Sequence, residues 1–178
     1  MTLTSTAAPT RSLKLGYDPT QDRLSLVLTD GTEPSIDLRL TRRFTQILLN
    51  GLAGIVERSS KIASQAPAEM RDDVILMEHQ RALNPSGTPR NATSWLPAMT
   101  RSKALPARLV SGVKVSVKPS RFELTIEADN EAVVTLPLDR LQLHRLLEQF
   151  KQHAEFADWK INIEAAWMEP EQTELVIN

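Results

Sequence analysis

Apolar and polar residues alternate in two short stretches near the beginning of the chain. The apolar positions are Leu24, Leu26 and Leu28 in the first stretch and Ile36, Leu38 and Leu40 in the second. A repeat of two residues places the apolar side chains of a stretch on one face of a β-strand. Asp30 and Gly31 lie between the stretches, and an Asp-Gly pair adopts the positive φ angles that a tight hairpin turn requires. The pattern therefore predicts a β-hairpin with one buried face.

The same pattern occurs a second time along the chain. Residues 23–52 align with residues 121–150 without a gap, at a constant shift of 98 positions, and apolar residues pair with apolar residues almost throughout. The second hairpin has its apolar positions at Phe122, Leu124, Ile126, Val134, Leu136 and Leu138. A further strand is predicted before each hairpin, at residues 13–17 and 113–117. We interpret this pattern as an internal duplication.

A helix is predicted after each hairpin. Thr41 and Asp139 suit the N-cap of a helix, because their side chains accept hydrogen bonds from backbone amides of the first turn. The apolar residues that follow at helical spacing are Phe44, Ile47, Leu48, Leu52 and Ile55 in the first copy and Leu143, Leu146, Leu147 and Phe150 in the second. The predicted fold class is α+β, built from an internally duplicated strand-strand-strand-helix unit.

The two units are expected to pack together, because about 45 residues bury too little apolar surface to be stable alone. One possible arrangement is a single antiparallel sheet of about six strands with both helices on one face. The other is two three-stranded sheets related by a pseudo-twofold axis. Pro137 lacks an amide donor, which favours an edge position for its strand.

The predicted organisation is a flexible tail followed by one compact domain of residues 13–178. The tail, residues 1–12, is rich in Ser, Thr, Ala and Pro. The segments of the domain are repeat one (13–60), an insertion with a helix and a long basic loop (61–109), repeat two (110–157) and a C-terminal hairpin (158–178). The strands of that last hairpin are predicted within Trp159–Trp167 and Thr173–Ile177.

The insertion interrupts the repeat. Residues 66–83 are predicted to form a helix that is entered at Pro67. The side chains available for burial on this helix are Met70, Val74, Met77 and Leu83. Residues 84–106 contain four prolines and one glycine, which predicts a long irregular connection. Such connections in compact domains are usually functional or mobile.

Composition narrows the class of protein. The chain has 178 residues, of which 41% are hydrophobic and 24% charged, as in folded soluble proteins. It contains no cysteine, which excludes disulfides, thiol nucleophiles and thiolate metal sites. No secretory signal and no apolar run of about 20 residues is found, so we expect a cytoplasmic protein that does not enter a membrane.

Charge is segregated along the chain. Between His79 and Arg121 there are eight basic residues and no acidic residue, whereas residues 123–178 contain twelve acidic and four basic residues. The candidate binding residues in the basic stretch are Arg90, Trp95, Arg101 and Lys103. Basic side chains with an aromatic one are typical of nucleic-acid binding. The alternative is that these charges solvate the loop or dock on the acidic half.

Three arginines lie close to the predicted start of the first helix. Arg39, Arg42 and Arg43 place positive charge where the helix dipole disfavours it. They are candidates for binding an anion or an acidic partner. The alternative is pairing with Asp37 or with the acidic second copy. Arg42 recurs as Arg140 in the second copy, so that position has a structural explanation as well.

Evidence for catalysis is sparse in the sequence. Glu78 and His79 form the single place where a histidine follows a carboxylate, and they are candidates for acid–base chemistry. The other histidines, His144 and His153, are nine residues apart on one predicted helix, which is a poor spacing for metal ligands. No glycine-rich phosphate loop and no nucleophile elbow is present. We expect no cofactor, no metal and no enzymatic activity.

Two short motifs carry a resemblance. Leu40-Thr41-Arg42-Arg43 at the first helix start and Glu78-His79-Gln80 resemble an LTRR…EHQ pattern in a family of small uncharacterised bacterial proteins. The resemblance covers about a quarter of the chain. It implies a bacterial cytoplasmic origin and a role for Arg42, Arg43 and His79, and it implies no particular activity.

The function expected from these features is that of a non-enzymatic protein-interaction or adaptor protein. Its partner would be another protein, or a second copy of this chain through the oppositely charged halves. The first alternative is a nucleic-acid-binding accessory protein that uses the basic loop together with Arg42 and Arg43. The second alternative is an enzyme that uses Glu78 and His79.

Overall fold

The computed structural model describes residues 12–29, 36–84, 100–101 and 107–168 of the chain. Its elements, in chain order, are β1 (Ser12–Asp18), β2 (Arg23–Thr29), β3 (Ile36–Leu40), α1 (Arg42–Ser59), α2 (Lys61–Gln65), the 3-10 helix η1 (Ala68–Met70), α3 (Arg71–Leu83), β4 (Thr100–Arg101), β5 (Arg108–Val117), β6 (Phe122–Ala128), β7 (Glu131–Leu138), α4 (Arg140–Phe156) and the 3-10 helix η2 (Ala166–Met168). The α+β class is confirmed. The predicted order of three strands and a helix occurs twice, while the common origin of the two units stays a prediction.

The strands form one mixed sheet in the order β1-β2-β3-β5-β6-β7-β4. Neighbouring strands are antiparallel within β1–β3 and within β5–β7. The two halves meet where β3 runs parallel to β5, pairing Leu38 with Arg108 and Arg39 with Leu109. Of the two predicted arrangements, the single sheet is therefore the one observed, but the expectation that it is purely antiparallel was wrong. A parallel pair needs a long crossover, and the segment from α1 to β4 provides it.

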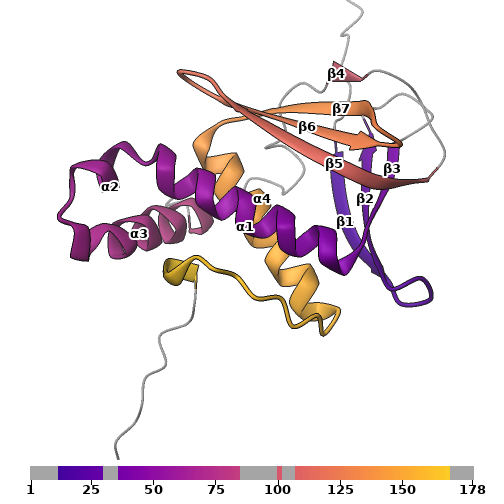
Figure 1. The fold of residues 1–178 in the computed structure, drawn as a ribbon, viewed down its shortest axis with the longest axis horizontal. Coiled ribbons are helices and arrows are strands. Elements are labelled where there is room, and N and C mark those ends of the chain that lie inside the picture. Colours follow the sequence, from indigo (N-terminus) through magenta and orange to yellow (C-terminus); the bar gives the residue numbers. More distant parts are fainter. Residues whose placement is uncertain (1–11, 30–35, 85–99, 102–106, 169–178) are drawn as a thin grey trace, which may run out of the picture.

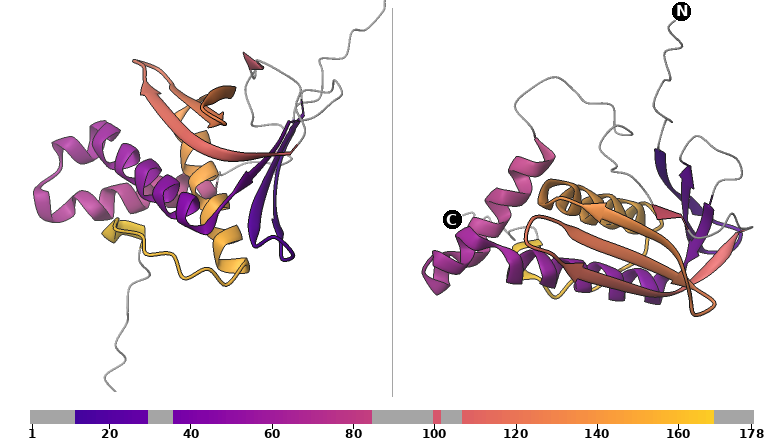
Figure 2. Two further views of the ribbon diagram at one scale, coloured as in Figure 1. Left: turned by 45° about the vertical axis from the view of Figure 1, so that its right-hand side comes forward. Right: turned by 90° about the horizontal axis from the view of Figure 1, so that it is seen from above.

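Both long helices, α1 and α4, lie on the same face of the sheet, and the two sheet halves bend around them (Figures 1 and 2). The alternation read from the sequence agrees with the burial. Every second residue is buried along β2, β3 and β6, and the residues between them are partly exposed. The side chains on one face of each of these strands thus pack against the helices, as the period of two predicts.

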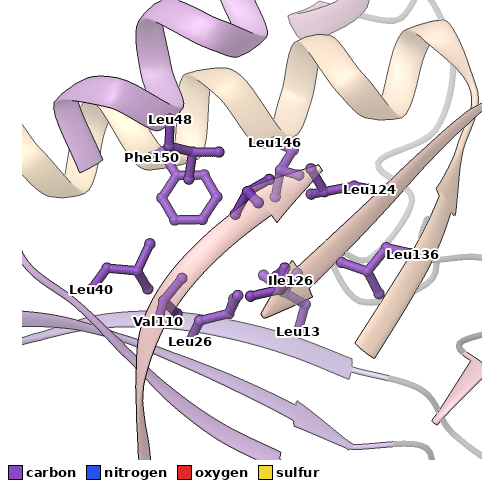
Figure 3. A pocket seen from close by; sticks show the side chains of 11 residues that line it. Leu13, Leu26, Leu40, Leu48, Val110, Leu124, Ile126, Leu136, Leu146 and Phe150 are labelled. Carbon is purple, nitrogen blue, oxygen red and sulfur yellow. The ribbon is translucent and has the colours of Figure 1, made fainter. Parts of the chain in front are cut away.

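The core is centred where the two halves meet. Side chains from β1–β3, from β5–β7 and from both helices surround a small apolar cavity (Figure 3). Its lining residues are Leu13, Leu26, Leu40, Leu48, Val110, Val113, Leu124, Ile126, Leu136, Leu146 and Phe150. The cavity volume is about 10 Å³, about that of one water-sized sphere. This cavity is therefore a packing gap in a shared core and is too small for an organic ligand.

The turn of the second hairpin has the geometry that its residues favour. Asp129 and Asn130 join β6 to β7 with φ angles of 53° and 63°. Two successive positive φ angles characterise the type I′ turn, whose twist matches that of the flanking strands. The turn predicted at Asp30 and Gly31 lies outside the described residues. Pro137 lies in β7, which pairs on its outer side only with the two-residue β4 among the described strands.

Both predicted helix caps are confirmed. The Thr41 side chain accepts a hydrogen bond from the amide of Phe44, and Asp139 forms a capping box with Gln142. The predicted apolar face of α4 is buried throughout. On α1 the buried face is shifted, since Leu49, Ala53 and Val56 are buried while Ile47 is exposed.

The predicted helix over residues 66–83 was wrong in extent and in its buried face. The chain forms α2, η1 and α3 in succession, and α3 begins only at Arg71. Met70 and Met77 are exposed, whereas Ile75, His79 and Ala82 are buried. The buried face is the one that contacts α4 and η2, so these tertiary partners and not the local apolar spacing set the orientation of α3.

The strand predicted within Trp159–Trp167 was also wrong. Residues 159–165 have no regular secondary structure, and η2 follows them. Asn50 of α1 donates to the carbonyl of Asn162 and accepts from the amide of Glu164, so this segment runs along α1. The Asn50 side chain therefore forms hydrogen bonds with a carbonyl and an amide that were expected to pair with a neighbouring strand. The predicted second strand, Thr173–Ile177, lies outside the described residues.

We predict that Phe150→Ala destabilises the whole fold, because the ring is fully buried at the junction of the sheet halves. The free energy of unfolding, measured with urea, should fall by about 3 to 5 kcal/mol. Phe156→Ala on the same helix is the matched control, because that ring is 80% exposed, and it should change stability by less than about 0.5 kcal/mol. Similar losses in both variants would contradict this description of the core.

Candidate functional site

A buried polar cluster lies where α3, α4 and η2 meet. His79 of α3 and His144 of α4 are 6% and 2% exposed. Their Nδ1 atoms are 3.1 Å apart, which is hydrogen-bonding distance. The other ring nitrogen of His79, Nε2, lies 3.2 Å from a carboxylate oxygen of Glu148. Three titratable side chains from two helices thus form a continuous chain of contacts.

The elements around the cluster fix these side chains. His144 and Glu148 are four residues apart on α4, so they lie on one face of that helix. Trp167 of η2 packs its ring edge-on against both histidines, with ring centroids 5.2 Å from His79 and 6.4 Å from His144. The Trp167 indole donates a hydrogen bond of 2.9 Å to Glu57 of α1. The aromatic ring therefore closes the cluster on the η2 side.

The environment of the cluster shifts two pKa values. Burial is the largest cause that lowers the pKa of His144, and together with electrostatic interactions with His79 and Arg140 it brings this pKa to about 3. The hydrogen bond from His79 lowers the pKa of Glu148, assisted by Gln152. At neutral pH the cluster therefore contains an uncharged His144 beside an ionised Glu148.

The contacts limit how many protons the pair of rings can hold. Only one proton fits between two Nδ1 atoms 3.1 Å apart, so one ring donates and the other accepts. The Nε2 atom of His144 is buried and has no hydrogen-bond partner among the described residues. A second proton, which would make His144 positively charged, would find no described acceptor at Nε2, because Glu148 already pairs with His79. The arrangement is suited to hold His144 neutral.

A second polar network joins the same helices beside the histidine pair. Arg140, at the start of α4, contacts the Glu78 carboxylate at 2.5 Å and the Ser59 hydroxyl at 2.8 Å. It also donates to the Val56 carbonyl near the end of α1. Ser60, which caps α2, donates to the other oxygen of Glu78. Arg140 therefore links α1, α3 and α4 through one guanidinium group.

The arginines predicted to form one binding cluster differ in their contacts. Arg39 lies on β3 and pairs with Asp18 and Asp37, as the alternative interpretation expected. Arg42 donates to the Lys160 carbonyl and so holds the segment after α4. Arg43 is exposed on the first turn of α1. The structure does not bring these arginines together with His79.

The prediction for His79 also needs correction. As a residue 6% exposed within the cluster, it does not lie on a surface that a partner or an anion can reach in this conformation. Its neighbour Glu78 contacts Arg140 and Ser60 and points to a different network. The two residues predicted to work together in acid–base chemistry therefore have separate partners, and no described pocket joins them to Arg43.

Most of the predicted basic loop lies outside the described residues. Arg90, Trp95 and Lys103 lie outside the described residues, and Arg101 is described only as part of β4, where it pairs with Val134. Four cations later in the basic stretch contact acidic side chains of β6 or of the β6–β7 turn. These contacts are Arg108 with Asp129, Lys114 with Glu127, and Lys118 and Arg121 with Glu123. For these four residues, the alternative of docking on the acidic half is confirmed.

The sequence contained a signal for the cluster that our interpretation missed. His144 and Glu148 have the i, i+4 spacing of a side-chain pair on one helix face, but His144 was weighed only against His153 as a metal ligand. His153 instead contacts the Gln149 carbonyl and lies away from the cluster. Across the described ranges, no three His, Asp or Glu side chains are placed to bind one metal ion.

A second candidate site lies on the surface of the helices after α1. We call α2, η1 and α3, residues 61–83, the helical arm. The arm extends from the body at the end remote from β1–β3 (Figure 1). Ile62, Met70 and Met77 of the arm are 64%, 51% and 68% exposed. A contiguous exposed apolar patch marks an interaction site, and these three side chains make the arm a candidate for one.

Comparisons of the chain with models of known protein families, with curated protein sequences and with solved structures find no match. None of the helices in the described ranges combines the length and the apolar character needed to cross a bilayer. The function is therefore argued from the two candidate sites.

We predict that acidification lowers stability through His144. Its folded-state pKa of about 3 lies below the unfolded value of about 6.5. Between these values protons bind the unfolded chain preferentially, so the stabilisation is complete above pH 6.5 and is lost as the pH falls. The slope from this group is at most about 1.4 kcal/mol per pH unit. Glu148, whose pKa is also lowered, adds a loss in the same direction at lower pH.

Urea unfolding between pH 8 and pH 5 measures this effect. His144→Asn keeps a short polar side chain that does not titrate, and it should flatten the slope below pH 6.5. His153→Asn is the matched control, because His153 lies on the same helix outside the cluster, and it should keep the slope of the wild type. Parallel curves for wild type and His144→Asn would contradict the assignment.

We predict that Glu78→Gln destabilises the protein by about 1 to 3 kcal/mol, because Arg140 loses its charged partner at a site where both side chains are mostly buried. Thermal or urea unfolding at pH 7 measures the loss. Glu69→Gln changes an exposed carboxylate on the same arm and should shift stability by less than about 0.5 kcal/mol. Equal effects would show that Arg140 does not depend on Glu78.

Proposed function

We propose that the protein is a non-enzymatic protein-interaction or adaptor protein and that its partner binds the helical arm. The observation that carries this proposal is the exposure of Ile62, Met70 and Met77 on one short segment. All three side chains lie within residues 62–77, and an exposed apolar surface of this kind favours a protein-binding role. Methionine suits such a role because its flexible, polarizable side chain adapts to different partner surfaces.

The arm supports a partner of a particular chemistry. Met70 and Met77 are seven residues apart, which is close to two helical turns, so their Cα atoms lie on the same side of the arm. Glu69, Asp72 and Asp73 are exposed around the start of α3. We therefore propose a partner segment that presents apolar side chains flanked by basic ones, because opposite charges speed and orient such association.

The proposed adaptor acts in the bacterial cytoplasm and has no catalytic role. A second copy of the chain is one partner that would satisfy it. The nucleic-acid alternative stays a prediction that depends mainly on Arg90, Trp95 and Lys103, outside the described residues. It gains no support from the basic residues after 107 that contact acidic side chains.

We predict that changing the arm abolishes partner binding. The test variant is Ile62→Ser/Met70→Gln/Met77→Gln, and the matched control is Ile47→Ser/Phe156→Ser, which removes apolar side chains that are exposed outside the arm. Each tagged protein is used for pull-down from a bacterial lysate with and without nuclease. A protein retained by wild type and control should be reduced at least about tenfold by the arm variant, with nuclease making no difference.

Sedimentation of the purified proteins tests whether the partner is a second copy of the chain. If the arm mediates self-association, wild type and control should sediment as dimers or larger species and the arm variant as a monomer. Equal retention of all partners by both variants would contradict the proposal. Partners that vanish with nuclease would favour the nucleic-acid alternative instead.

A further inference from the structure

The contact between the arm and the body buries few large apolar side chains and includes a histidine. The buried side chains of α3 are Ile75, His79 and Ala82. By contrast, α4 buries four leucine or phenylalanine side chains in addition to His144 and Ala154. The free energy of local opening depends on the apolar surface that an element buries, so α3 is a candidate for opening while the sheet and α4 stay folded.

Hydrogen bonds and ion pairs add to the apolar contacts of α3 with α4. They include Glu78 with Arg140, and Arg145 with the Ala82 carbonyl at 2.9 Å. The contact at the centre is the pair of histidines, which is covered by Trp167 of η2. If α3 leaves, the ring of His144 loses its hydrogen-bond partner and gains water.

We propose that the helical arm is docked through a proton-sensitive contact and that acidification releases α3 from α4 and η2 before the sheet unfolds. The inference concerns the arm itself and does not depend on what the arm binds. It follows from the arrangement of the two Nδ1 atoms, which share a single proton. It also follows from the Nε2 atom of His144, for which the described part of the chain provides no acceptor.

The charged groups around His144 all favour its neutral form or are already paired. From α3 it faces His79, and Glu78 is held by Arg140. From α4 it is near the positive Arg140, while Glu148 pairs with His79 and lies near Lys151. From α1, Glu57 binds the indole of Trp167, and η2 itself has no titratable side chain. Among the residues that the structure describes, therefore, no carboxylate contacts His144 in the docked arm.

The size of the effect follows from the proton affinity of His144 in the two states. Released into water, the ring has its ordinary pKa of about 6.5, whereas burial in the docked arm lowers its pKa to about 3. The ratio of released to docked arm should then rise about 30-fold between pH 8 and pH 5. At pH 8 the ring is neutral in both states and contributes nothing to release.

Hydrogen exchange of the full chain tests this inference. Protection factors of amides within 71–83 and within β2 and β6 are measured by mass spectrometry at pH 8 and pH 5, with rates corrected for the intrinsic effect of pH. The series is repeated at low urea concentrations, because a local opening depends on urea much less than global unfolding does. The proteins compared are wild type, His144→Asn and the control His153→Asn.

We expect the α3 amides of wild type to open more readily than the strands, with little dependence on urea, and to lose about 30-fold in protection between pH 8 and pH 5. The loss should be retained in His153→Asn and be absent in His144→Asn. If the asparagine variant fails to fold, as judged by circular dichroism, His144→Phe provides an apolar ring of similar size that does not titrate.

Two results would overturn the inference. The first is exchange of α3 only together with β2 and β6, with the same urea dependence, since the arm would then have no opening of its own. The second is an equal loss of protection in wild type and in the folded His144 variant, since another group would then be responsible.

Discussion

The packing of α1 and α4 into the bend between the two sheet halves is the interaction on which the rest of the structure depends. In the described ranges, backbone pairing between the halves consists of two residue pairs of β3 and β5. Side chains from both halves and both helices instead meet in one apolar core around Phe150 (Figure 3). The hydrophobic effect is non-directional. It can therefore hold the two halves of the sheet at an angle that a continuous hydrogen-bonded ladder would resist.

The helical arm is attached by a different kind of interaction. The body is held by apolar area, whereas α3 contacts α4 and η2 through histidines, carboxylates and arginines. Burying such groups costs free energy unless each has a hydrogen-bond or ion-pair partner. These partners are available only when α3 lies in its observed position. In the inference drawn above, the position of the arm depends on the protonation of His144, whereas α4 is held by the apolar core. The exposed methionines lie on the segment that this contact positions.

The success of sequence-based prediction differed sharply between α4 and α3. The apolar face of α4 was predicted correctly because Leu143, Leu146, Leu147 and Phe150 are buried by the adjacent core. The buried face of η1 and α3 was predicted wrongly, because Met70 and Met77 were expected to be buried and are exposed. The buried residue His79 gains its partners His144 and Glu148 from positions 65 and 69 residues away. Local periodicity contains no information about such contacts.

The amino-acid sequence alone determined the features that arise from neighbouring residues. These are the alternating strands, the caps at Thr41 and Asp139, and the hairpin turn at Asp129 and Asn130, because each depends on backbone preferences and hydrogen bonds within a few positions. Only the tertiary structure decided the parallel contact of β3 with β5, the side of α3 that is buried and the path of residues 159–165 along α1. Each of these depends on groups distant in the chain, and their geometry exists only once the core has formed.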